Sequence, residues 1–531
     1  MKLLIPSAGI GSRINAYTKK RNKALVTVGG KPAIVRIIDY YIEHFDIDQV
    51  VIIIGYKGEI LEDCLRAFYD DSFVEFVYVD KYEGLGSGLG YTLSKAKHLL
   101  QCEFIFSTND TLLTLNKVDM RTDSSFAIYK TVSPKAIDVS QFRTLEISDN
   151  KVIKLNPKGL NCHNVYLGVC FIKDYTSFWA GMAHESALLA GEVIGLQALT
   201  NLRAIEALDW FDLGQVETLR ETQRKHKVED IEVLEKNDEA IWFTGGEVIK
   251  HHIDPTFIED RINRLNYLPA EITPELTSRG KYFYKYNMVE GKTISSDVDR
   301  NSFQELLGVI LQQLWSNQCE DPERLAKLKT QALDFYQVKT LKRVSDYING
   351  SEYYDRDVVI NGVSCPPILE VLTSVNWTKL IDNCHFANFH GDLHNENILK
   401  TKTGFCLLDW RQNFGPGEYE FGDVYYDQAK LRHGLMVNHS IVNKGSYSVR
   451  HFKNGDVIVE ILQSSRLVEI DDVLTKFIVS EGYNEQFLNF VTALIYLNIA
   501  ALHDAQYGEF LFYYGRLKLN DALMQLSEST N

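Results

Sequence analysis

The sequence predicts an α/β protein: an open, largely parallel sheet with covering helices, then a second part that begins with short strands and becomes mostly helical. Three observations lead to this prediction. Residues 1–120 alternate short apolar runs with helical patterns, which is typical of parallel strands joined by right-handed crossovers. Short strand patterns recur between residues 231 and 286. From residue 300 to the end, most segments have helical spacing.

In the first part, apolar runs alternate with two helical patterns, at 33–45 and 59–68. The run at 50–54 has no polar alternation, which favours a strand covered on both faces. Residues 125–172 contain short strand-like pieces and turns. A helix is predicted near 195–208, and a charged helix from 216 to about 229. We place a domain boundary near 226–232. The apolar runs predicted as strands are Leu3–Ile5, Val50–Ile54, Phe76–Val79 and Phe104–Phe106.

The second part opens with a predicted meander. Its strands are Ile231–Leu234, Ala240–Phe243 and Val248–Lys250, with Gly245-Gly246 as a turn. A helix over 255–267 and a strand at Tyr282–Tyr286 follow. The later helices are interrupted by a β-rich insert at about 389–410. The predicted domains are therefore 1–228, 229–292 and 293–531.

Composition excludes several classes of protein. The 531 residues include 45% hydrophobic and 24% charged residues, as expected of globular domains. The formal net charge of −15 argues against nucleic acid as a partner, because a phosphate backbone requires a basic surface. The eight scattered cysteines predict free thiols rather than a disulfide framework. No signal peptide or long apolar run occurs, so we expect a cytoplasmic protein without membrane insertion.

A turn rich in small residues follows the first predicted strand. Its sequence is Ser7-Ala8-Gly9-Ile10-Gly11-Ser12-Arg13, and Asn22-Lys23-Ala24-Leu25 comes ten residues later. Small residues let backbone amides approach phosphates closely, and an arginine adds a forked cation. Taken alone, such a glycine turn is weak evidence for a nucleotide site.

The combination resembles the nucleotidyltransferases that activate sugar phosphates and phosphocholine. The matching segments, in order, are Ala8–Arg13, Lys23-Ala24-Leu25, Gly30-Lys31-Pro32, Gly55-Tyr56-Lys57, Gly84–Gly90, Asn109-Asp110 and Trp210–Gly214. Asn22 stands where the family has proline, and Ser7 where it has alanine. The resemblance covers about 225 residues and implies a Rossmann-like, GT-A-like domain.

The resemblance also implies a division of roles. Arg13 and Lys23 would neutralise charge that builds up at the α-phosphate. Asp110 and Asp212 would hold Mg²⁺, although each could instead be a cap or turn former. Lys154 and Lys158 are weaker candidates for contact with the acceptor phosphate. Residues implied to bind the nucleotide are Ala8, Gly9, Gly11 and Ser12 at the phosphates, and Gly84, Gly86 and Ser87 at the base.

The most specific motif lies in the last third of the chain. It reads His390-Gly-Asp-Leu-His-Asn-Glu-Asn397, and Leu407-Leu408-Asp409-Trp410 follows. Phosphoryl transfer needs an acceptor for the hydroxyl proton and oxygen ligands for metal ions. Asp392 would take the first role, and Asn397 with Asp409 the second.

This stretch resembles the aminoglycoside-phosphotransferase and choline-kinase-like family of small-molecule kinases. The resemblance implies a two-lobed, protein-kinase-like fold over 229–531, and it is strongest in 388–430. Lys250 would contact the ATP phosphates, with Glu259, or alternatively Asp260, as its ion-pair partner. Met288 and Glu290 would lie in the hinge that binds adenine. The aspartates of Gly422-Asp423 and Asp427 are more plausibly structural or substrate-side. His251-His252 is interpreted as lobe surface.

Together the motifs predict a bifunctional enzyme. A small hydroxyl substrate, X, would be phosphorylated with ATP, and X-phosphate would then react with a second NTP, CTP or UTP, to give NDP-X for a surface polysaccharide or lipopolysaccharide. Alternatives are a choline kinase fused to a CTP:phosphocholine cytidylyltransferase, and an enzyme with one inactive, regulatory domain. A protein kinase is disfavoured because activation-loop signals are missing after Asp409. A homo-oligomer is possible. Aromatic residues could enclose a quaternary ammonium, although core packing is the stronger interpretation for them: Trp410, Tyr425, Tyr426, Tyr507, Phe510, Tyr513 and Tyr514.

Overall fold

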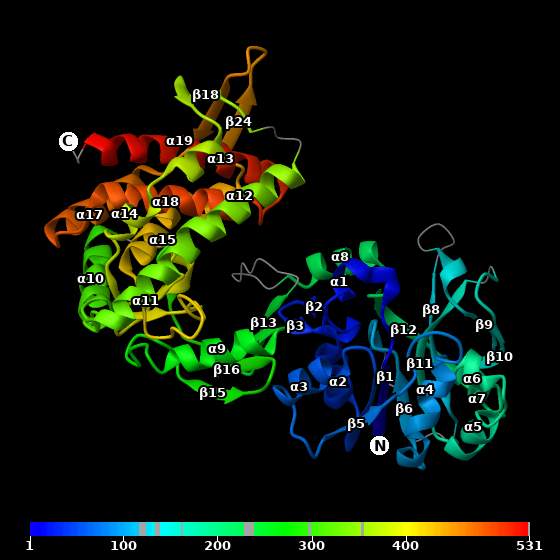
Figure 1. The fold of residues 1–531 in the computed structure, drawn as a ribbon. Coiled ribbons are helices and arrows are strands. Elements are labelled where there is room, and N and C mark those ends of the chain that lie inside the picture. Colours follow the sequence, from blue (N-terminus) through cyan, green and yellow to red (C-terminus); the bar gives the residue numbers. More distant parts are fainter. Residues whose placement is uncertain are drawn as a thin grey trace. The chain divides into compact units, whose positions relative to one another are not determined.

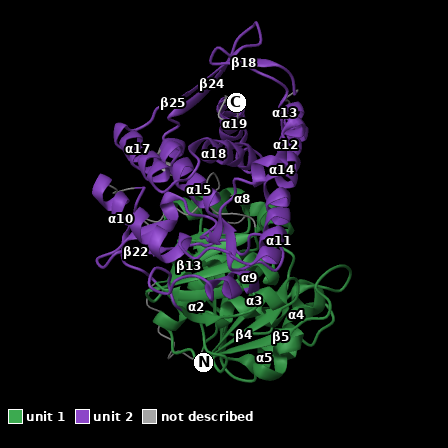
Figure 2. Ribbon diagram, turned by 60° about the vertical axis from the view of Figure 1, so that its left-hand side comes forward, with its two compact units in different colours: residues 1–258, 276–287 green, residues 259–275, 288–531 purple. Residues whose placement is uncertain are grey.

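The computed structural model, drawn in Figure 1, describes residues 1–115, 124–132, 138–160, 163–227, 238–295, 299–351 and 355–528. The strand predicted at Ile231–Leu234 lies outside these residues. The chain divides into two compact units (Figure 2). Unit 1 comprises 1–258 and 276–287, and unit 2 comprises 259–275 and 288–531. Each unit is described by itself.

Unit 1 contains a large mixed sheet. Its order is β5-β4-β1-β6-β11-β8-β12-β10-β9, with β7 paired to β12. Strands β5, β4, β1 and β6 are parallel, and β11 runs antiparallel to β6. The strands of this sheet are β1 (Lys2–Ser7), β4 (Gln49–Ile54), β5 (Val74–Tyr78), β6 (Phe104–Ser107), β7 (Thr111–Leu115), β8 (Phe126–Thr131), β9 (Thr144–Ser148), β10 (Lys151–Asn156), β11 (Asn164–Ile172) and β12 (Arg203–Asp212).

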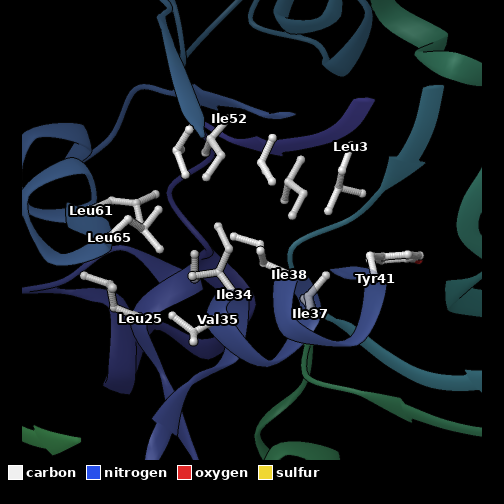
Figure 3. Packing of buried hydrophobic residues seen from close by; sticks show 14 of the residues in the cluster. Leu3, Leu25, Ile34, Val35, Ile37, Ile38, Tyr41, Ile52, Leu61 and Leu65 are labelled. Carbon is white, nitrogen blue, oxygen red and sulfur yellow. The ribbon is translucent and has the colours of Figure 1, made fainter. Parts of the chain in front are cut away.

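Helices cover both faces of this sheet. Along β4, Val50, Ile52 and Ile54 contribute to one hydrophobic cluster, whereas Val51 and Ile53 contribute to the other, because successive side chains point to opposite faces. Helices α2 and α3 complete the first cluster (Figure 3), and α4, α5 and α7 complete the second. The helices are α1 (Asn15–Thr18), α2 (Ala33–His44), α3 (Gly58–Arg66), α4 (Leu89–Ala96), α5 (Tyr175–Gly181), α6 (Ala187–Ala190), α7 (Glu192–Gln197) and α8 (Val216–Lys225).

The prediction of a Rossmann-like α/β fold is confirmed for the N-terminal region, but the helix predicted near 195–208 is wrong. Helix α7 ends at Gln197, and the chain then extends as β12. Apolar residues at 204, 207, 208 and 211 fit a helical face as well as a strand. Pairing with β8 on one side and β7 on the other decides the outcome, since tertiary context overrides local propensity.

A second sheet belongs to unit 1. Its order is β13-β14-β16-β15, formed by β13 (Glu239–Thr244), β14 (Glu247–His252), β15 (Leu276–Arg279) and β16 (Phe283–Asn287). Ala240, Trp242, Ile249, Tyr282 and Phe283 lie in the same hydrophobic cluster as α2 and α3. The short hairpin of β2 (Thr27–Val28) and β3 (Lys31–Pro32) adjoins this sheet, because the backbone N–H of Phe243 donates to the carbonyl of Gly30 at 2.9 Å. The strands predicted as the start of a separate lobe therefore share a core with residues 1–227.

Trp242 is at the centre of this shared core. It is fully buried and stacks on His251, with ring centroids 5.0 Å apart, and its Nε1 donates to Thr27 Oγ1 at 3.1 Å. The interpretation of His251 as lobe surface is wrong: the ring is buried, and its Nδ1 lies 3.3 Å from Cys64 Sγ. Burial lowers the pKa of His251 to about 3, so the ring packs as a neutral aromatic.

We expect Trp242→Ala to destabilise unit 1 by about 3–5 kcal/mol, the usual cost of truncating a buried tryptophan. Urea unfolding followed by circular dichroism measures this change. Leu208→Ala is the matched control, because Leu208 is an exposed apolar residue of the same unit. Equal stabilities of the Trp242→Ala variant and the wild type would contradict a shared core.

Unit 2 is mostly helical, with short strand pairs that sequence patterns partly missed. Hairpin β18–β19 and hairpin β24–β25 pair into one sheet and were expected to be helical. The strands of unit 2 are β17 (Lys292–Thr293), β18 (Val358–Ile360), β19 (Val363–Cys365), β20 (Phe386–Asn388), β21 (Ile398–Lys400), β22 (Phe405–Leu407), β23 (Phe421–Asp423), β24 (Tyr447–His451) and β25 (Val457–Ile461). The remaining helices are α9 (Pro255–Leu265, which spans the division between units), α10 (Arg300–Ile310), α11 (Pro322–Leu333), α12 (Lys339–Gly350), α13 (Ile368–Ser374), α14 (Trp377–Ile381), α15 (Val424–Met436), α16 (His439–Asn443), α17 (Ser465–Ser480), α18 (Glu485–Ala500) and α19 (Ala505–Glu528).

Two π-helical turns interrupt the helices of unit 2, at Leu311–Trp315 and Asp334–Val338. Such turns are rare and occur frequently at functional sites. Within the described ranges, no helix has both the length and the apolar character required to cross a bilayer.

Candidate functional site

The glycine-bearing turn after β1 is open and exposed, as a phosphate-binding loop must be. Gly9 is exposed, and a Cβ at this position would meet no atom within 4 Å. Gly11 has φ 71°, in the left-handed region, and precedes a 3₁₀ turn formed by Ser12–Ile14. Ala8 is buried under the turn. Backbone amides are therefore accessible at the carboxyl end of β1, where α/β sheets bind ligands.

Asn22 fastens this turn to its neighbours. It is fully buried, and its Nδ2 donates to the carbonyls of Ser7 at 2.9 Å and Tyr56 at 2.7 Å. Its Oδ1 accepts from the backbone N–H of Ala24 at 2.9 Å, which begins the turn that carries Lys23. Asn22 thus places Lys23 by hydrogen bonds, where the resembling family has a stiff proline. Its presence gives no reason to regard the domain as inactive.

We expect Asn22→Ala to lower stability by about 3 kcal/mol, because two buried carbonyls and one buried N–H lose their partner. Nucleotidyl transfer should fall as well, since Lys23 would no longer be held in place. A thermal scan and a pyrophosphate-release assay on the same preparation measure the two effects. Asn201→Ala, at an exposed position of the same unit, serves as the control for loss of an asparagine. An unaltered melting temperature would contradict the assigned role of Asn22.

Two acidic residues meet two basic residues where β7 begins and β12 ends. These strands pair antiparallel with Asp212 opposite Thr111, and the N–H of Leu213 donates to the carbonyl of Asp110 at 2.8 Å. Lys23 Nζ lies 2.5 Å from Asp110 Oδ2, and Arg13 Nη2 lies 4.0 Å from the same oxygen. Residues separated by up to 199 positions are thereby brought to one site.

Gly214 makes this convergence possible. A Cβ there would lie 2.9 Å from Asp212 Oδ1 and 3.3 Å from both Arg13 Nη2 and Asp110 Oδ2. The N–H of Gly214 donates to Asp212 Oδ1 at 3.0 Å and so orients that carboxylate. Any larger residue would displace the charged groups.

The two carboxylates have opposite pKa shifts. Burial alone would raise the pKa of Asp110, but the positive charge and hydrogen bond of Lys23 outweigh it and lower the pKa. Burial, and then the negative charge of Asp110, raise the pKa of Asp212. Lys23 and Arg13 act on Asp212 more weakly, and in the described part of the chain Asp212 forms no ion pair of its own.

These residues fit a magnesium ion. Asp212 Oδ2 is buried and has no hydrogen-bond partner in the described part of the chain. A buried carboxylate oxygen without a partner is costly, and a bound cation would remove that cost. Mg²⁺ needs only one or two carboxylates, since it keeps water and phosphate ligands. Asp110 and Asp212 would hold it, and there it would neutralise phosphate charge.

The loop predicted to read the nucleobase is exposed. Gly84 and Gly86 have φ of 79° and 84°, a conformation that favours glycine. Ser87 Oγ donates to the carbonyl of Gly84 at 2.7 Å and closes the loop. Lys154, one of the two candidates for the acceptor phosphate, is exposed and lies 3.5 Å from Glu146. The roles of these residues stay predictions.

The second motif forms an ordered loop within unit 2. Asn397 Nδ2 donates to the carbonyl of Asp392 at 2.9 Å, and the N–H of Leu408 donates to the carbonyl of Asn397 at 2.7 Å. Asp409 adopts φ 55°, an uncommon conformation for a residue with a side chain that is found at functional sites. The structure brings Asp392, Asn397 and Asp409 to the open end of the β21–β22 hairpin, where β21 begins and β22 ends.

Asp392 faces a cation. Its Oδ1 lies 2.8 Å from Lys430 Nζ of α15, and about a third of its side chain (35%) is exposed. Burial alone would raise the pKa of Asp392, but the charge of Lys430 outweighs it and holds the pKa below its ordinary value. Asp392 is therefore a reachable, ionised carboxylate, as a group that orients a hydroxyl must be.

Asp423 and Asp427, which were expected to be structural or substrate-side, accept hydrogen bonds from groups in and around the loop. Both are fully buried. Asp427 accepts from the backbone N–H groups of His390 and Gly391, each at 2.6 Å. Asp423 accepts from the hydroxyl of Tyr336 at 2.7 Å and the N–H of His385 at 3.0 Å. Burial raises the pKa of each aspartate to about 6.

We expect the stability of the wild type, relative to that of Asp423→Asn, to be about 2 kcal/mol lower at pH 7.0 than at pH 4.5. The folded-state pKa of about 6 exceeds the ordinary 3.8, so the stabilising contribution is present below the ordinary value and is lost as pH rises through 6. An asparagine preserves the acceptor oxygen but does not titrate. Urea midpoints of both proteins at pH 4.5 and 7.0 measure the difference. A pH-independent difference would contradict this account.

The predicted ATP-binding residues lie on both sides of the division between units. Lys250 is buried on β14 in unit 1, whereas Glu259 is exposed and belongs to unit 2. Asp260, the alternative partner, accepts from Tyr419 at 2.7 Å and Asn413 at 2.9 Å. Met288 and Glu290, the predicted hinge residues, are exposed. The nucleotide-binding roles of Lys250, Glu259, Met288 and Glu290 stay predictions.

Sequence reasoning missed Lys430, Arg411 and Lys339, which lie near Asp392. Lys430 comes one helical turn after the buried Asp427 on α15. This spacing could have indicated from the sequence that Lys430 lies near the loop of Asp392. All seven aromatic residues considered for a quaternary ammonium are buried. Tyr426 has Lys339 Nζ 5.6 Å and Lys430 Nζ 5.8 Å from its ring centroid.

Comparison with known proteins gives a match for the part of the chain that forms this α/β fold and site. The N-terminal region resembles sugar-phosphate and phosphocholine nucleotidyltransferases. It is 25% identical over 226 residues to the bifunctional protein GlmU of Methanococcus maripaludis, covering 40% of this chain and 51% of GlmU. It is 31% identical over 134 residues to choline-phosphate cytidylyltransferase of Streptococcus pneumoniae, covering 24% and 54%. The solved CTP:phosphocholine cytidylyltransferase of S. pneumoniae is 23% identical, covers 43% of this chain and 99% of that protein, and gives a TM-score of 0.36.

These similarities are partial. The first curated relatives are matched over about a third to a half of their own length. No family model matches the chain. The kinase resemblance of residues 388–430 stays a prediction from its motif.

Proposed function

We propose that the protein is a bifunctional activating enzyme. Its C-terminal site would transfer the γ-phosphoryl group of ATP to a hydroxyl of a small molecule, X. Its N-terminal site would then couple X-phosphate to an NTP, with CTP or UTP as the expected nucleotide, and release pyrophosphate. The product, NDP-X, would be an activated sugar or polyol for surface polysaccharide or lipopolysaccharide synthesis.

The observation that carries the proposal is the convergence of Arg13, Lys23, Asp110 and Asp212 around Gly214. In the proposed transfer, an X-phosphate oxygen bonds to the α-phosphorus, and the bond to the bridging oxygen of pyrophosphate breaks. Arg13 and Lys23 stabilise the charge that develops there, and this preorganised stabilisation is usually the largest catalytic term. Asp110 holds Lys23 in position before the substrate arrives.

The C-terminal step is supported by the loop geometry of unit 2. The hydroxyl oxygen of X would bond to the γ-phosphorus, ADP would leave, and the hydroxyl proton would pass to Asp392 and then to water. Asn397 and Asp409 would hold Mg²⁺ at the phosphates of ATP. Asp427 fixes the backbone before Asp392, so that little reorganisation is needed during the reaction.

A second candidate is a choline kinase joined to a CTP:phosphocholine cytidylyltransferase. It is favoured by the similarity to choline-phosphate cytidylyltransferases of S. pneumoniae and Haemophilus influenzae, the latter 27% identical over 161 residues. One experiment distinguishes the candidates. The full chain is incubated with ATP, Mg²⁺ and sugars, polyols, choline or ethanolamine, and ADP is measured. Each phosphorylated product is then tested with CTP, UTP and GTP for pyrophosphate release. ADP formation without subsequent pyrophosphate release would contradict the coupled function.

A further inference from the structure

Three basic side chains lie close to one another beside Asp392. Lys430 Nζ contacts Asp392 Oδ1 at 2.8 Å. Lys339 Nζ lies 4.0 Å from the ring centroid of Phe335, and the Arg411 guanidinium lies 4.7 Å from the same ring. The basic cluster is defined as Lys339, Arg411 and Lys430.

The cluster is held by elements that meet only in the folded unit. The second π-helical turn, Asp334–Val338, contains Phe335 and ends immediately before Lys339, the first residue of α12. Helix α15 supplies Lys430. Arg411 follows the metal-ligand candidate Asp409 by two residues, and its N–H donates to the carbonyl of His390 at 3.0 Å.

The positive charge of the cluster exceeds the negative charge beside it. Lys430 is paired with Asp392, whereas Arg411 Nε donates to the neutral carbonyl of Asn413 at 2.8 Å. Within the described residues, Lys339 Nζ has no hydrogen bond or ion pair, and its contacts are the rings of Phe335 and Tyr426. Among the residues that the structure describes, two basic side chains beside the carboxylate that would orient the substrate, Lys339 and Arg411, thus form no ion pair.

The titration of Lys339 agrees with this charge imbalance. Burial lowers its pKa well below the ordinary 10.5, and the positive charges of Arg411 and Lys430 lower it further. Arg343, one turn along α12, acts in the same direction, and Asp392 is the carboxylate that opposes them. A bound anion would relieve the repulsion among these side chains.

We infer that the phosphate acceptor of the C-terminal site is an alcohol that carries a carboxylate or phosphate group, which Lys339 and Arg411 bind while Asp392 faces the hydroxyl. This inference rests on the proposed kinase activity and deepens it. It disfavours choline and other cationic alcohols, because a quaternary ammonium would meet basic side chains and no carboxylate other than Asp392, which Lys430 already pairs. The ring of Tyr426, which could have contacted such a group, already has two lysines near it.

The test compares alcohols that differ in charge. The full chain with ATP and Mg²⁺ is given glycerol against D-glycerate and glycerol 3-phosphate, ribitol against ribitol 5-phosphate, and choline, and ADP formation is measured. We expect the anionic member of a pair to be preferred. The carboxylate and phosphate arms identify which anion the cluster binds.

Lys339→Met and Arg411→Gln remove one charge each and preserve much of the side-chain volume. Each should raise KM for the anionic acceptor by about tenfold or more, with kcat and the KM for ATP little changed, as expected when a ground-state ion pair is lost. Lys342→Met is the matched control, because Lys342 is an exposed lysine on the same helix, α12. A rise in the KM for ATP alone would assign the cluster to the nucleotide and overturn the inference.

A binding measurement separates failure of the inference from failure of the kinase. Pyridoxal 5′-phosphate, an aldehyde with a phosphate group, forms imines with unprotonated lysines that borohydride then fixes. Labelling of Lys339 in preference to Lys342, with protection by D-glycerate or glycerol 3-phosphate but not by glycerol, supports an anion site. Equal use of neutral or cationic alcohols overturns the inference and leaves the kinase intact. Protection of Lys339 without phosphorylation of any alcohol instead overturns the kinase and the acceptor role of the bound anion.

Discussion

Replacing Asp110 by asparagine should lower the rate of nucleotidyl transfer by about two to three orders of magnitude, the usual effect of removing one preorganised electrostatic group. ATP-dependent formation of X-phosphate should be unchanged, since that activity is assigned to residues of unit 2. The reason is the position of the carboxylate. Asp110 Oδ2 holds Lys23 Nζ at 2.5 Å, faces Arg13 and shares the site with Asp212. Pyrophosphate release from NTP and purified X-phosphate measures the effect.

Asp212→Asn is the informative companion. Asp110→Asn leaves the mostly buried Lys23 (11% exposed) without its carboxylate and should lower the melting temperature. Asp212→Asn removes a charge that burial already disfavours, so the melting temperature should hold or rise while activity is lost. The control is Asp209→Asn, at an exposed position of the same strand, β12. If both site variants retained full nucleotidyl transfer, the assigned catalytic site would be wrong.

Metal binding provides a readout that does not depend on turnover. Mn²⁺ can replace Mg²⁺ at oxygen-ligand sites, and its binding to the full chain is followed by electron paramagnetic resonance. We expect one class of Mn²⁺ site to weaken in both Asp110→Asn and Asp212→Asn and to remain in Asp209→Asn. Unchanged binding in all three would place the metal elsewhere.

The strand at residues 50–54 was predictable because its apolar run is covered on both faces. Residues 50–54 of β4 are fully buried, so no polar, solvent-facing residue interrupts the apolar run. In contrast, the apolar spacing of β12 fits both a helix and a strand, and its conformation depends on partners far away in the sequence. Local patterns cannot supply such information.

The candidate site was predictable as a set of residue types but not as a geometry. Arg13, Lys23, Asp110 and Asp212 follow from the resemblance, yet their convergence depends on Gly214 and on the β7–β12 pairing. Asn22 was interpreted as a departure from the family pattern. Its three hydrogen bonds are visible only when β1 and the turn near Tyr56 are side by side.

The same limit applies to His251 and the basic cluster. His251 lies in a polar stretch, Lys250-His251-His252, that is typical of a surface strand. Its burial follows from the packing of β14 against α3 and Trp242. Lys339 is separated from Asp392 by 53 positions, and only the folded unit brings their charges together.

Replacing Asp392 by asparagine should abolish most ATP-dependent phosphorylation, with a loss of about 10²–10⁴-fold, the range for a group that accepts a proton during the reaction. The loop should keep its shape, but the melting temperature should fall, because Lys430 (14% exposed) loses its carboxylate. Asn397 bonds to the backbone carbonyl of Asp392 rather than to its carboxylate, and Asp427 holds the N–H groups of His390 and Gly391. ADP formation with the preferred alcohol from the screen measures the loss.

The control for Asp392→Asn is Asp382→Asn. Asp382 also pairs with a lysine, Lys329, at 2.7 Å, but both side chains are more than half exposed, so the same chemical change should cost little.

Asp392→Asn should still convert supplied X-phosphate to NDP-X, because that step is assigned to unit 1. This result would distinguish a protein with two active sites from a protein with one active site and an inactive, regulatory domain. If Asp392→Asn left ADP formation intact, the protein could not use this loop for phosphoryl transfer. Loss of both activities in Asp392→Asn, with the circular dichroism spectrum of the folded protein unchanged, would instead show that nucleotidyl transfer depends on the C-terminal site.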